Sequence, residues 1–348
     1  MKALVKYGVT DGDVELREVP EPEIGPEDVL LEVKAAGVCG SDIEMWHHKV
    51  TFPVNVPVIQ GHEFCGVIKE IGAQVKGFKP GDRVVSETAA HICGHCYHCR
   101  AGEYNLCPER KGYGSAINGC FTKYVKVLAR ILHYIPENVD FDAAALTEPA
   151  CVAYNAVFIK SHLRPGEPVA VIGPGPIGLF AVQMARIGGA YPIILIGTAA
   201  DAGRMEIGQK IGANMTINVS QEDPEEVIGK LTGGLGVPLV IDAAGNNAAL
   251  KTAMALVRRN GQITKIGWGP KPVDMSLDPI IAKAATLQGS FSHTWSTWEA
   301  VLQLIANGTI MMEPMITHRF PLDKWEEAFR LVDAKVAVKV VIHPGVDN

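Results

Sequence analysis

The spacing of apolar residues changes near residue 150. Before it, short apolar runs such as 29–33 and 67–71 are separated by turn residues such as 79–82, which read Lys-Pro-Gly-Asp. Short runs between glycine and proline turns are typical of antiparallel strands. The first part of the chain is therefore predicted to be a mostly antiparallel, barrel-like β domain.

From about residue 151, longer apolar runs alternate with helical segments. Buried parallel strands are predicted over 169–172, 193–196, 239–242 and 262–266. This alternation predicts an α/β domain with a parallel sheet. Beyond about residue 291 the pattern predicts helices over 298–306 and 324–332 and a last strand over 338–342, which we expect to pair with the first domain.

Length and charge narrow the class of protein. A chain of 348 residues exceeds one ordinary hydrophobic core, so two domains are expected. The net charge of −6 and the absence of a basic run argue against a nucleic-acid partner. No signal-like segment and no apolar run of about 18 residues is present, so we expect a cytoplasmic protein without a membrane partner.

Four cysteines within about residues 91–110 have the spacing of one metal site. Cys93, Cys96, Cys99 and Cys107 can converge on a tetrahedral ion, and four thiolates leave no open position. The spacing thus predicts a structural zinc, with free or disulfide-bonded cysteines as the alternative. Such a lobe stabilises a loop and performs no chemistry.

A glycine-rich turn follows the first strand of the α/β part. Strand 169–172 runs into G-P-G-P-I-G, and a helix is predicted over 179–187. The members of this turn predicted to bind the cofactor are Gly173, Gly175, Pro176, Ile177 and Gly178. The glycines permit the tight turn, the approach of a pyrophosphate and close helix packing, and this context favours a dinucleotide over a turn of no function.

The end of the next strand bears on the choice between NAD and NADP. An acidic residue usually binds the ribose hydroxyls in NAD sites, whereas here small residues lead through Thr198 to Asp201. Arg204 could meet a 2′-phosphate or lie on the helix surface. The sequence therefore leaves both NAD and NADP open, with Thr198 and Arg204 as cofactor-binding candidates.

Further ligand-type side chains lie beside glycines in the first domain. Cys39 and Ser41 occur in G-V-C-G-S-D, His62 and Glu63 in G-H-E, and Glu148 in T-E-P. Three protein ligands with an open position form the usual catalytic zinc site. By residue type alone, a cysteine or histidine is more often a packed core residue.

The order of these motifs adds a resemblance. G-V-C-G-S-D, G-H-E, P-G-D-R-V, the four cysteines, T-E-P and G-P-G-P-I-G together resemble the zinc-dependent medium-chain dehydrogenases, nearest the polyol (sorbitol or iditol) and threonine dehydrogenase branch. The resemblance implies a GroES-like β-barrel catalytic domain from 1–150 and 291–348, and a doubly wound Rossmann domain over 151–290. It further implies homo-oligomers, with a tetramer favoured over a dimer.

The resemblance also implies roles for single residues. Cys39, His62 and Glu63 would hold a catalytic zinc, the second Zn²⁺ of each subunit, with Glu148 at the fourth ligand position or one water away. The alcohol dehydrogenase branch tends to have cysteine where Glu148 stands, so the carboxylate favours polyols. Ser41 would be the first proton relay.

The chain departs from the family at three places. Glu44 replaces a frequent histidine, Ser292-His293 replaces an Arg-Tyr pair of sorbitol-type enzymes, and the segment after Trp46 lacks the Trp-Asp of the threonine branch. The residues considered for the substrate pocket are Glu44, Trp46, His47, Phe52, His293 and Trp295.

The function expected is the oxidation of a secondary alcohol of a polyol or sugar-like substrate by hydride transfer to NAD(P), with Cys39, Ser41, His62 and Glu148 at the catalytic centre. Alternatives within enzymes are an L-threonine or simple alcohol dehydrogenase of the same family and a zinc-independent enzyme of the quinone reductase type. A structural or regulatory protein and a zinc-finger nucleic-acid binder are the alternatives outside enzymes.

Overall fold

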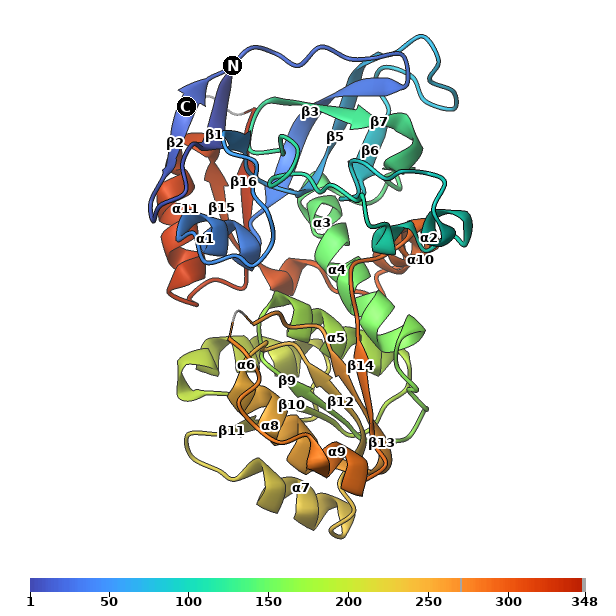
Figure 1. The fold of residues 1–348 in the computed structure, drawn as a ribbon, viewed down its shortest axis with the longest axis vertical. Helices are drawn as coiled ribbons and strands as arrows, with labels where there is room; N and C mark the ends of the chain where they lie inside the picture. The colour runs from blue at the N-terminus through green and yellow to red at the C-terminus, as the bar shows by residue number, and fades with distance from the viewer. Residues whose placement is uncertain (270, 346–348) are drawn as a thin grey trace. The chain divides into compact units, whose positions relative to one another are not determined.

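The computed structural model describes residues 1–269 and 271–345. The chain divides into two compact units (Figure 1). Unit 1 comprises 1–148, 293–308 and the chain from 316 onward; unit 2 comprises 149–292 and 309–315.

Unit 1 is built mainly from antiparallel strands. Its strands are β1 (Lys2–Lys6), β2 (Val14–Glu18), β3 (Asp28–Gly37), β4 (Val58–Ile59), β5 (Glu63–Ile71), β6 (Arg83–Ser86), β7 (Tyr124–Leu128), β8 (Leu132–Tyr134), β15 (Ile316–Pro321) and β16 (Lys339–His343). One sheet has the order β2-β1-β4 and the larger one β15-β16-β3-β5-β6-β8, with β7 on β3. Only β15 and β16 pair in parallel among the described strands of this unit. The expected return of the last strand is confirmed, because β16 pairs with β3.

Short helices complete unit 1. They are α1 (Gly40–Trp46), α2 (Tyr97–Arg100), α3 (Phe141–Ala145), α10 (Trp295–Ala306) and α11 (Trp325–Asp333), and α4 (Thr147–Tyr154) begins in this unit. The core between strands and helices contains fully buried aromatic side chains such as Phe64, Phe121 and Phe329. Burial of such large apolar groups is the main stabilising contribution to the unit.

Unit 2 contains one six-stranded parallel sheet. Its strands are β9 (Val169–Ile172), β10 (Ile193–Gly197), β11 (Met215–Asn218), β12 (Val237–Asp242), β13 (Val257–Lys265) and β14 (Thr286–Gly289). The spatial order is β11-β10-β9-β12-β13-β14, and every neighbouring pair is parallel. This is the doubly wound order. From β9 the chain first adds β10 and β11 on one side and then β12, β13 and β14 on the other, so the order reverses beside β9. The predicted parallel strands are confirmed.

Helices connect the strands of unit 2. They are α5 (Pro176–Ile187), α6 (Ala202–Ile211), α7 (Pro224–Thr232), α8 (Asn247–Leu256) and α9 (Asp278–Ala282) (Figure 1). Fully apolar strands such as β9 and β10 lie buried, as expected for a sheet covered on both faces.

One segment lies elsewhere than expected. Residues 309–315 pack with unit 2, although the sequence boundary placed everything after 291 in the first domain. Two side chains of α5 explain this: Gln183 bonds both the N–H and the carbonyl of Met311, and Arg186 donates to the carbonyl of Thr309. Hydrogen bonds to backbone groups cannot be read from apolar spacing.

No helix among the described residues has the length and apolar character needed to cross a bilayer.

Candidate active site and metal centres

The four cysteines of the lobe converge. Their sulfurs all lie within 4.8 Å of one another, and Cys93 Sγ is 3.9 Å from Cys99 Sγ and 3.6 Å from Cys107 Sγ. A tetrahedral ion with Zn–S bonds of about 2.3 Å holds sulfurs about 3.8 Å apart. The side chains present therefore fit a zinc ion.

Backbone amides support the same sulfurs. The N–H of Cys96 donates to Cys93 Sγ, the N–H of Cys99 to Cys96 Sγ, and the N–H of Cys93 to Cys107 Sγ. Hydrogen bonds from backbone N–H groups lower the pKa of Cys93 to about 6, whereas burial and neighbouring thiols raise the pKa of Cys99 to about 12. No disulfide joins any of the eight cysteines, all of which lie among the described residues.

The second cluster forms where two strands meet. β3 ends at Gly37 and β5 begins at Glu63, and these two residues are opposite each other in the antiparallel pair. Cys39 caps the N-terminus of α1, and its backbone N–H donates to Asp42 Oδ2 over 2.9 Å. The pairing brings one ligand atom each from Cys39, His62 and Glu63 within 4.8 Å of one another.

The charges around His62 favour a cation. Its Nδ1 lies 3.7 Å from Oδ1 of Asp42, and that buried oxygen has no hydrogen-bond partner among the described residues. Burial lowers the pKa of His62, but the negative charges of Asp42 and Cys39 outweigh it, and the pKa lies well above its usual value. Thiolate, imidazole and carboxylate are the donors zinc prefers, so the residues present fit this ion as well.

A lysine that the sequence reasoning missed lies at this cluster. Lys339 of β16 is buried, and its Nζ donates to Glu63 Oε2 and to the carbonyl of Val38. Burial would lower the pKa of Lys339, but pairing with Glu63 raises it above the usual value. The pairing of β16 with β3 places it there, more than 270 residues from its partner, a distance no local motif spans.

Glu148 lies near this cluster but outside the group of three. Its Oε1 is 3.2 Å from Nε2 of the buried His293, and its charge interacts with His62, Glu63 and Lys339. Burial raises the pKa of Glu148, but the hydrogen bond from His293 and the positive charges of His293, His62 and Lys339 together outweigh this, so the pKa lies below its usual value. The glutamate is thus held as a carboxylate.

The other first-domain candidates have different outcomes. Ser41 is half-buried in the first turn of α1, two residues after Cys39. Trp46 and His47, both considered for the substrate pocket, have other partners in the structure. Trp46 packs edge-on against Trp325 in the core. His47 Nδ1 and Nε2 lie 2.7 Å and 3.2 Å from carboxylates of Asp11 and Asp333. An aromatic side chain next to a ligand motif is often simply core.

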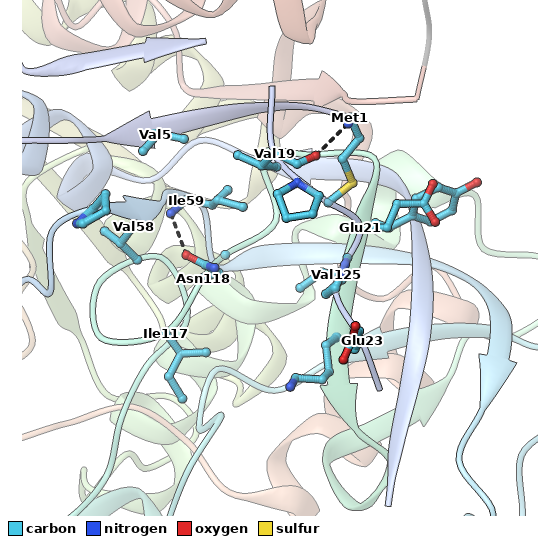
Figure 2. A pocket seen from close by; sticks show the side chains of 16 residues that line it. Met1, Val5, Val19, Glu21, Glu23, Val58, Ile59, Ile117, Asn118 and Val125 are labelled. Carbon is cyan, nitrogen blue, oxygen red and sulfur yellow. Dashed lines mark hydrogen bonds between the residues drawn. The ribbon is translucent and has the colours of Figure 1, made fainter. Parts of the chain in front are cut away.

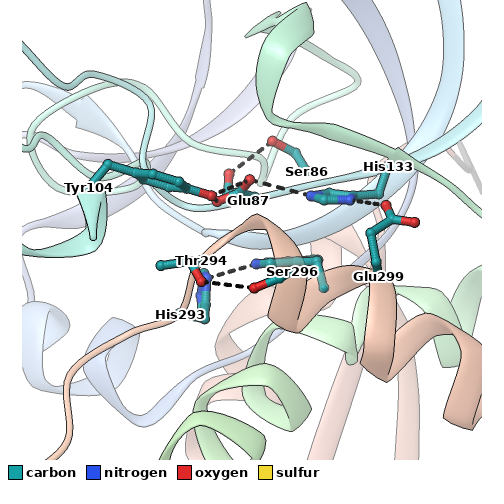
Figure 3. A network of polar contacts seen from close by, with 9 residues as sticks. Ser86, Glu87, Tyr104, His133, His293, Thr294, Ser296 and Glu299 are labelled. Carbon is teal, nitrogen blue, oxygen red and sulfur yellow. Dashed lines mark hydrogen bonds and ion pairs between the residues drawn. The ribbon is translucent and has the colours of Figure 1, made fainter. Parts of the chain in front are cut away.

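His133 and Glu87 form a second polar network beside α10 (Figure 3). Tyr104 donates to the carboxylate of Glu87, whose Oε1 lies 3.3 Å from His133 Nε2. His133 Nδ1 lies 2.5 Å from Oε1 of Glu299. Tyr104 belongs to the loop between Cys99 and Cys107, so the network attaches the lobe to the rest of unit 1.

The glycine-rich turn has the form its sequence predicts. Gly173 has φ of 98°, and a Cβ on Gly178 would lie 1.9 Å from the carbonyl oxygen of Gly173. A Cβ on Gly175 would meet nothing within 4 Å, so the space in front of it is open. The first intrahelical bond is donated by Leu179, which leaves the N–H groups of Ile177 and Gly178 for an anion, whereas Pro176 has none. This cradle fits a dinucleotide pyrophosphate.

The end of β10 carries the residues considered for cofactor choice. Asp201 turns back and accepts from the N–H and hydroxyl of Thr198, at 3.0 and 2.7 Å. Arg204 is buried in α6; burial lowers its pKa and Asp201 partly offsets this. The only carboxylate of this turn is therefore occupied as a helix cap.

A separate pocket of about 680 Å³ lies in unit 1 (Figure 2). Apolar side chains such as Val5, Val19, Val58 and Ile59 line it. None of the predicted catalytic, metal or cofactor residues is part of this lining.

Comparisons with known proteins identify the family. Residues 25–137 match the alcohol dehydrogenase GroES-like domain and residues 176–307 the zinc-binding dehydrogenase domain. A sorbitol dehydrogenase of Halalkalibacterium halodurans is 37% identical, with 99% of each chain covered, and an L-threonine 3-dehydrogenase of Bacillus subtilis is 35% identical, also with 99% of each covered.

A solved structure agrees with this. The crystal structure of a zinc-binding dehydrogenase from Sinorhizobium meliloti 1021, bound to NADP, matches with a TM-score of 0.91 at 32% identity over 99% of each chain. The chain belongs to the zinc-dependent medium-chain dehydrogenase family. The expected GroES-like and Rossmann folds are confirmed, and the protein is an oxidoreductase that uses zinc and NAD or NADP.

Proposed function

We propose that this protein oxidises a secondary alcohol of a polyol or sugar-like substrate to a ketone, with transfer of the hydride to NAD(P). The observation that carries the proposal is the cluster of Cys39, His62 and Glu63 ligand atoms within 4.8 Å, with the carboxylate of Glu148 beside it. The similarity to a sorbitol dehydrogenase supports the polyol as substrate class.

The residues of unit 1 have distinct roles in this proposal. Cys39, His62 and Glu63 hold the zinc, and Glu148 lies at the fourth ligand position or one water away. Zinc held there supplies a Lewis acid that lowers the pKa of a hydroxyl group. The carboxylate of Asp42, 3.7 Å from Nδ1 of His62, places a negative charge behind the ring, as carboxylates do behind ligating histidines.

Proton and hydride leave the substrate by separate routes. The Ser41 hydroxyl accepts the proton of the substrate hydroxyl and passes it on, and a bound nicotinamide ring would accept the carbinol hydrogen with its electron pair. Ketone, reduced cofactor and one proton result. The N–H groups of Ile177 and Gly178 bind the pyrophosphate, and Gly173 and Gly175 shape the turn that admits it.

The occupied Asp201 supports use of NADP. Its carboxylate caps Thr198 instead of standing free to repel a 2′-phosphate. We therefore propose that NADP is accepted along with NAD, with Thr198 and Arg204 on the adenosine ribose side. Steady-state kinetics with both cofactors tests this, and a preference for NAD by several orders of magnitude contradicts it.

L-Threonine is a second candidate substrate, because a threonine 3-dehydrogenase of Bacillus subtilis is similar over 99% of both chains. The decisive assay is a parallel screen of polyols, sugars, acyclic diols and threonine with both cofactors. Reduction of NAD(P) with polyols and not with threonine supports the proposal. Turnover of threonine alone overturns the proposed substrate class.

We also propose a homo-oligomer, with a tetramer favoured over a dimer, on the strength of the sequence resemblance. Size-exclusion chromatography with light scattering measures the mass directly, and a monomer at micromolar concentration contradicts it.

A further inference from the structure

His293 has a role that the motifs do not give it. The ring lies buried between Trp298 and Glu148: the indole Nε1 of Trp298 is 2.7 Å from Nδ1, and Glu148 Oε1 is 3.2 Å from Nε2. An indole N–H can only donate, so Nδ1 must accept and carries no hydrogen. The single ring hydrogen is therefore on Nε2, where it donates to Glu148.

Trp298 is itself held in place. It is fully buried, and the His133 ring stacks on it with 5.5 Å between ring centroids and 10° between planes. Glu87 and Glu299 hold the two nitrogens of His133 (Figure 3). The donor that fixes the His293 tautomer thus has no alternative position without breaking a buried network.

The orientation of Glu148 follows from this bond. A carboxylate has two oxygens on a rigid plane, so a fixed donor at Oε1 limits the direction of Oε2. Glu148 lies close enough to His62, Glu63 and Lys339 for their charges to interact. A rotated carboxylate would change its distance to the Cys39, His62 and Glu63 donors.

We propose that His293 is a positioning residue that acts through Glu148: its Nε2–H tautomer, imposed by Trp298, holds the carboxylate in the direction of the Cys39–His62–Glu63 donor set. The inference rests on the proposed function, because that function gives Glu148 its place at the reactive centre. His293 then contacts neither the substrate nor the cofactor.

A double-mutant cycle tests whether His293 acts through Glu148. H293L, E148Q and the double variant are compared as zinc-loaded enzymes in kcat, in KM and in the rate of zinc transfer to a chromophoric chelator. H293L is expected to lower kcat by about 10 to 100-fold and to speed zinc transfer, as losses of groups behind metal ligands do. In the E148Q background the same change should add less than about twofold. If the fold-losses of kcat in H293L and E148Q multiply in the double variant, the two residues act independently and the proposal is overturned.

Three further variants guard against a trivial loss of folding. H293Q keeps an N–H near the position of Nε2 and should recover most of the lost kcat, whereas W298F keeps the imidazole but frees its tautomer and should lower kcat severalfold. Q303L is the matched control, since Gln303 lies in α10 like Trp298 and its side chain is exposed. A folded H293L or W298F enzyme with unchanged kcat and unchanged zinc transfer overturns the proposal.

The tautomer can be observed without turnover. In ¹⁵N-histidine-labelled, zinc-loaded protein, with the signal assigned by its loss in H293Q, the proposal predicts a pyrrole-type Nε2 and a pyridine-type Nδ1. The reverse assignment, or two protonated nitrogens, overturns it. Should every alcohol fail as substrate while tautomer and zinc transfer behave as predicted, the proposed function fails and the positioning role stands.

Discussion

The four-cysteine lobe and the Cys39–His62–Glu63 cluster both bring metal ligands together, yet their surroundings differ. The lobe takes all its ligands from one short loop, and three of its four cysteines are partly exposed. The reactive cluster takes its ligands from the adjoining ends of two paired strands, just after β3 and at the start of β5, and is backed by the buried side chains of Asp42 and Lys339. The lobe is supported by backbone N–H groups of its own loop, whereas the reactive cluster is supported by charged side chains from other parts of unit 1.

The largest expected effect concerns activity at the reactive cluster. Replacing Cys39 with Ala removes one donor of the open site and should lower kcat/KM by about 10³-fold or more, because the Lewis acid is lost with it. The thermal midpoint should change little, since Cys39 is partly exposed. Steady-state kinetics and thermal unfolding check this; near-normal rates in C39A would mean that the reactive centre lies elsewhere.

The next effect concerns the buried charge behind the cluster. K339M leaves Glu63 buried without its partner and should destabilise unit 1 by roughly 3 to 5 kcal/mol, whereas K339R keeps the charge and serves as control. The pKa of Lys339 lies above its usual value, so the pair contributes fully below about pH 10 and is lost only as pH rises through the higher folded value. Urea unfolding should show the same difference at about pH 6 and pH 9; a difference below about 1 kcal/mol would contradict the structural role.

The lobe should affect stability instead of chemistry. C96A opens the four-thiolate site and should lower the thermal midpoint by about 5 °C or more, because metal binding contributes to folding. At a temperature where the variant remains folded, kcat should fall less than in C39A. Calorimetry and kinetics on the same sample distinguish the effect on stability from the effect on activity. A C96A enzyme as inactive as C39A would contradict a purely stabilising role of the lobe.

The smallest effect is visible after zinc removal. In the lobe freed of metal, Cys93 should be alkylated by iodoacetamide at pH 7 at least about tenfold faster than Cys99, because the pKa values are about 6 and about 12 and the thiolate is the nucleophile. Alkylation of Cys93 should fall as pH drops below about 6. Peptide mass spectrometry measures both rates, and equal rates would contradict the role of the backbone N–H groups.

The parts of the fold that the sequence predicted are those with a local pattern. Buried strands such as β9 and β10 are unbroken apolar runs, and the turn at Gly173 has the glycines its close backbone approach requires. The spacing of Cys93 and Cys96 likewise determines their geometry within one turn. In each case a few residues adjacent in the sequence are enough to predict the local structure.

The parts that were not predicted depend on contacts between distant residues. Lys339 lies in an apolar strand and reaches Glu63 only because β16 pairs with β3. His293 was considered for the substrate pocket, but its partners Glu148 and Trp298 give it a different environment. By sequence alone Asp201 could still bind a ribose, whereas in the structure its carboxylate accepts hydrogen bonds from Thr198. Polar networks of this kind are set by tertiary packing.

The central claim is that two zinc ions occupy two sites with separate roles. Elemental analysis of wild-type, C39A and C96A protein, purified with ample zinc and paired with turnover of the best alcohol, tests it most directly. We expect two zinc ions per chain in the wild type, one in each variant, and the complete loss of turnover in C39A only. A C39A protein that retains two zinc ions and its turnover would contradict the separate roles of the two sites.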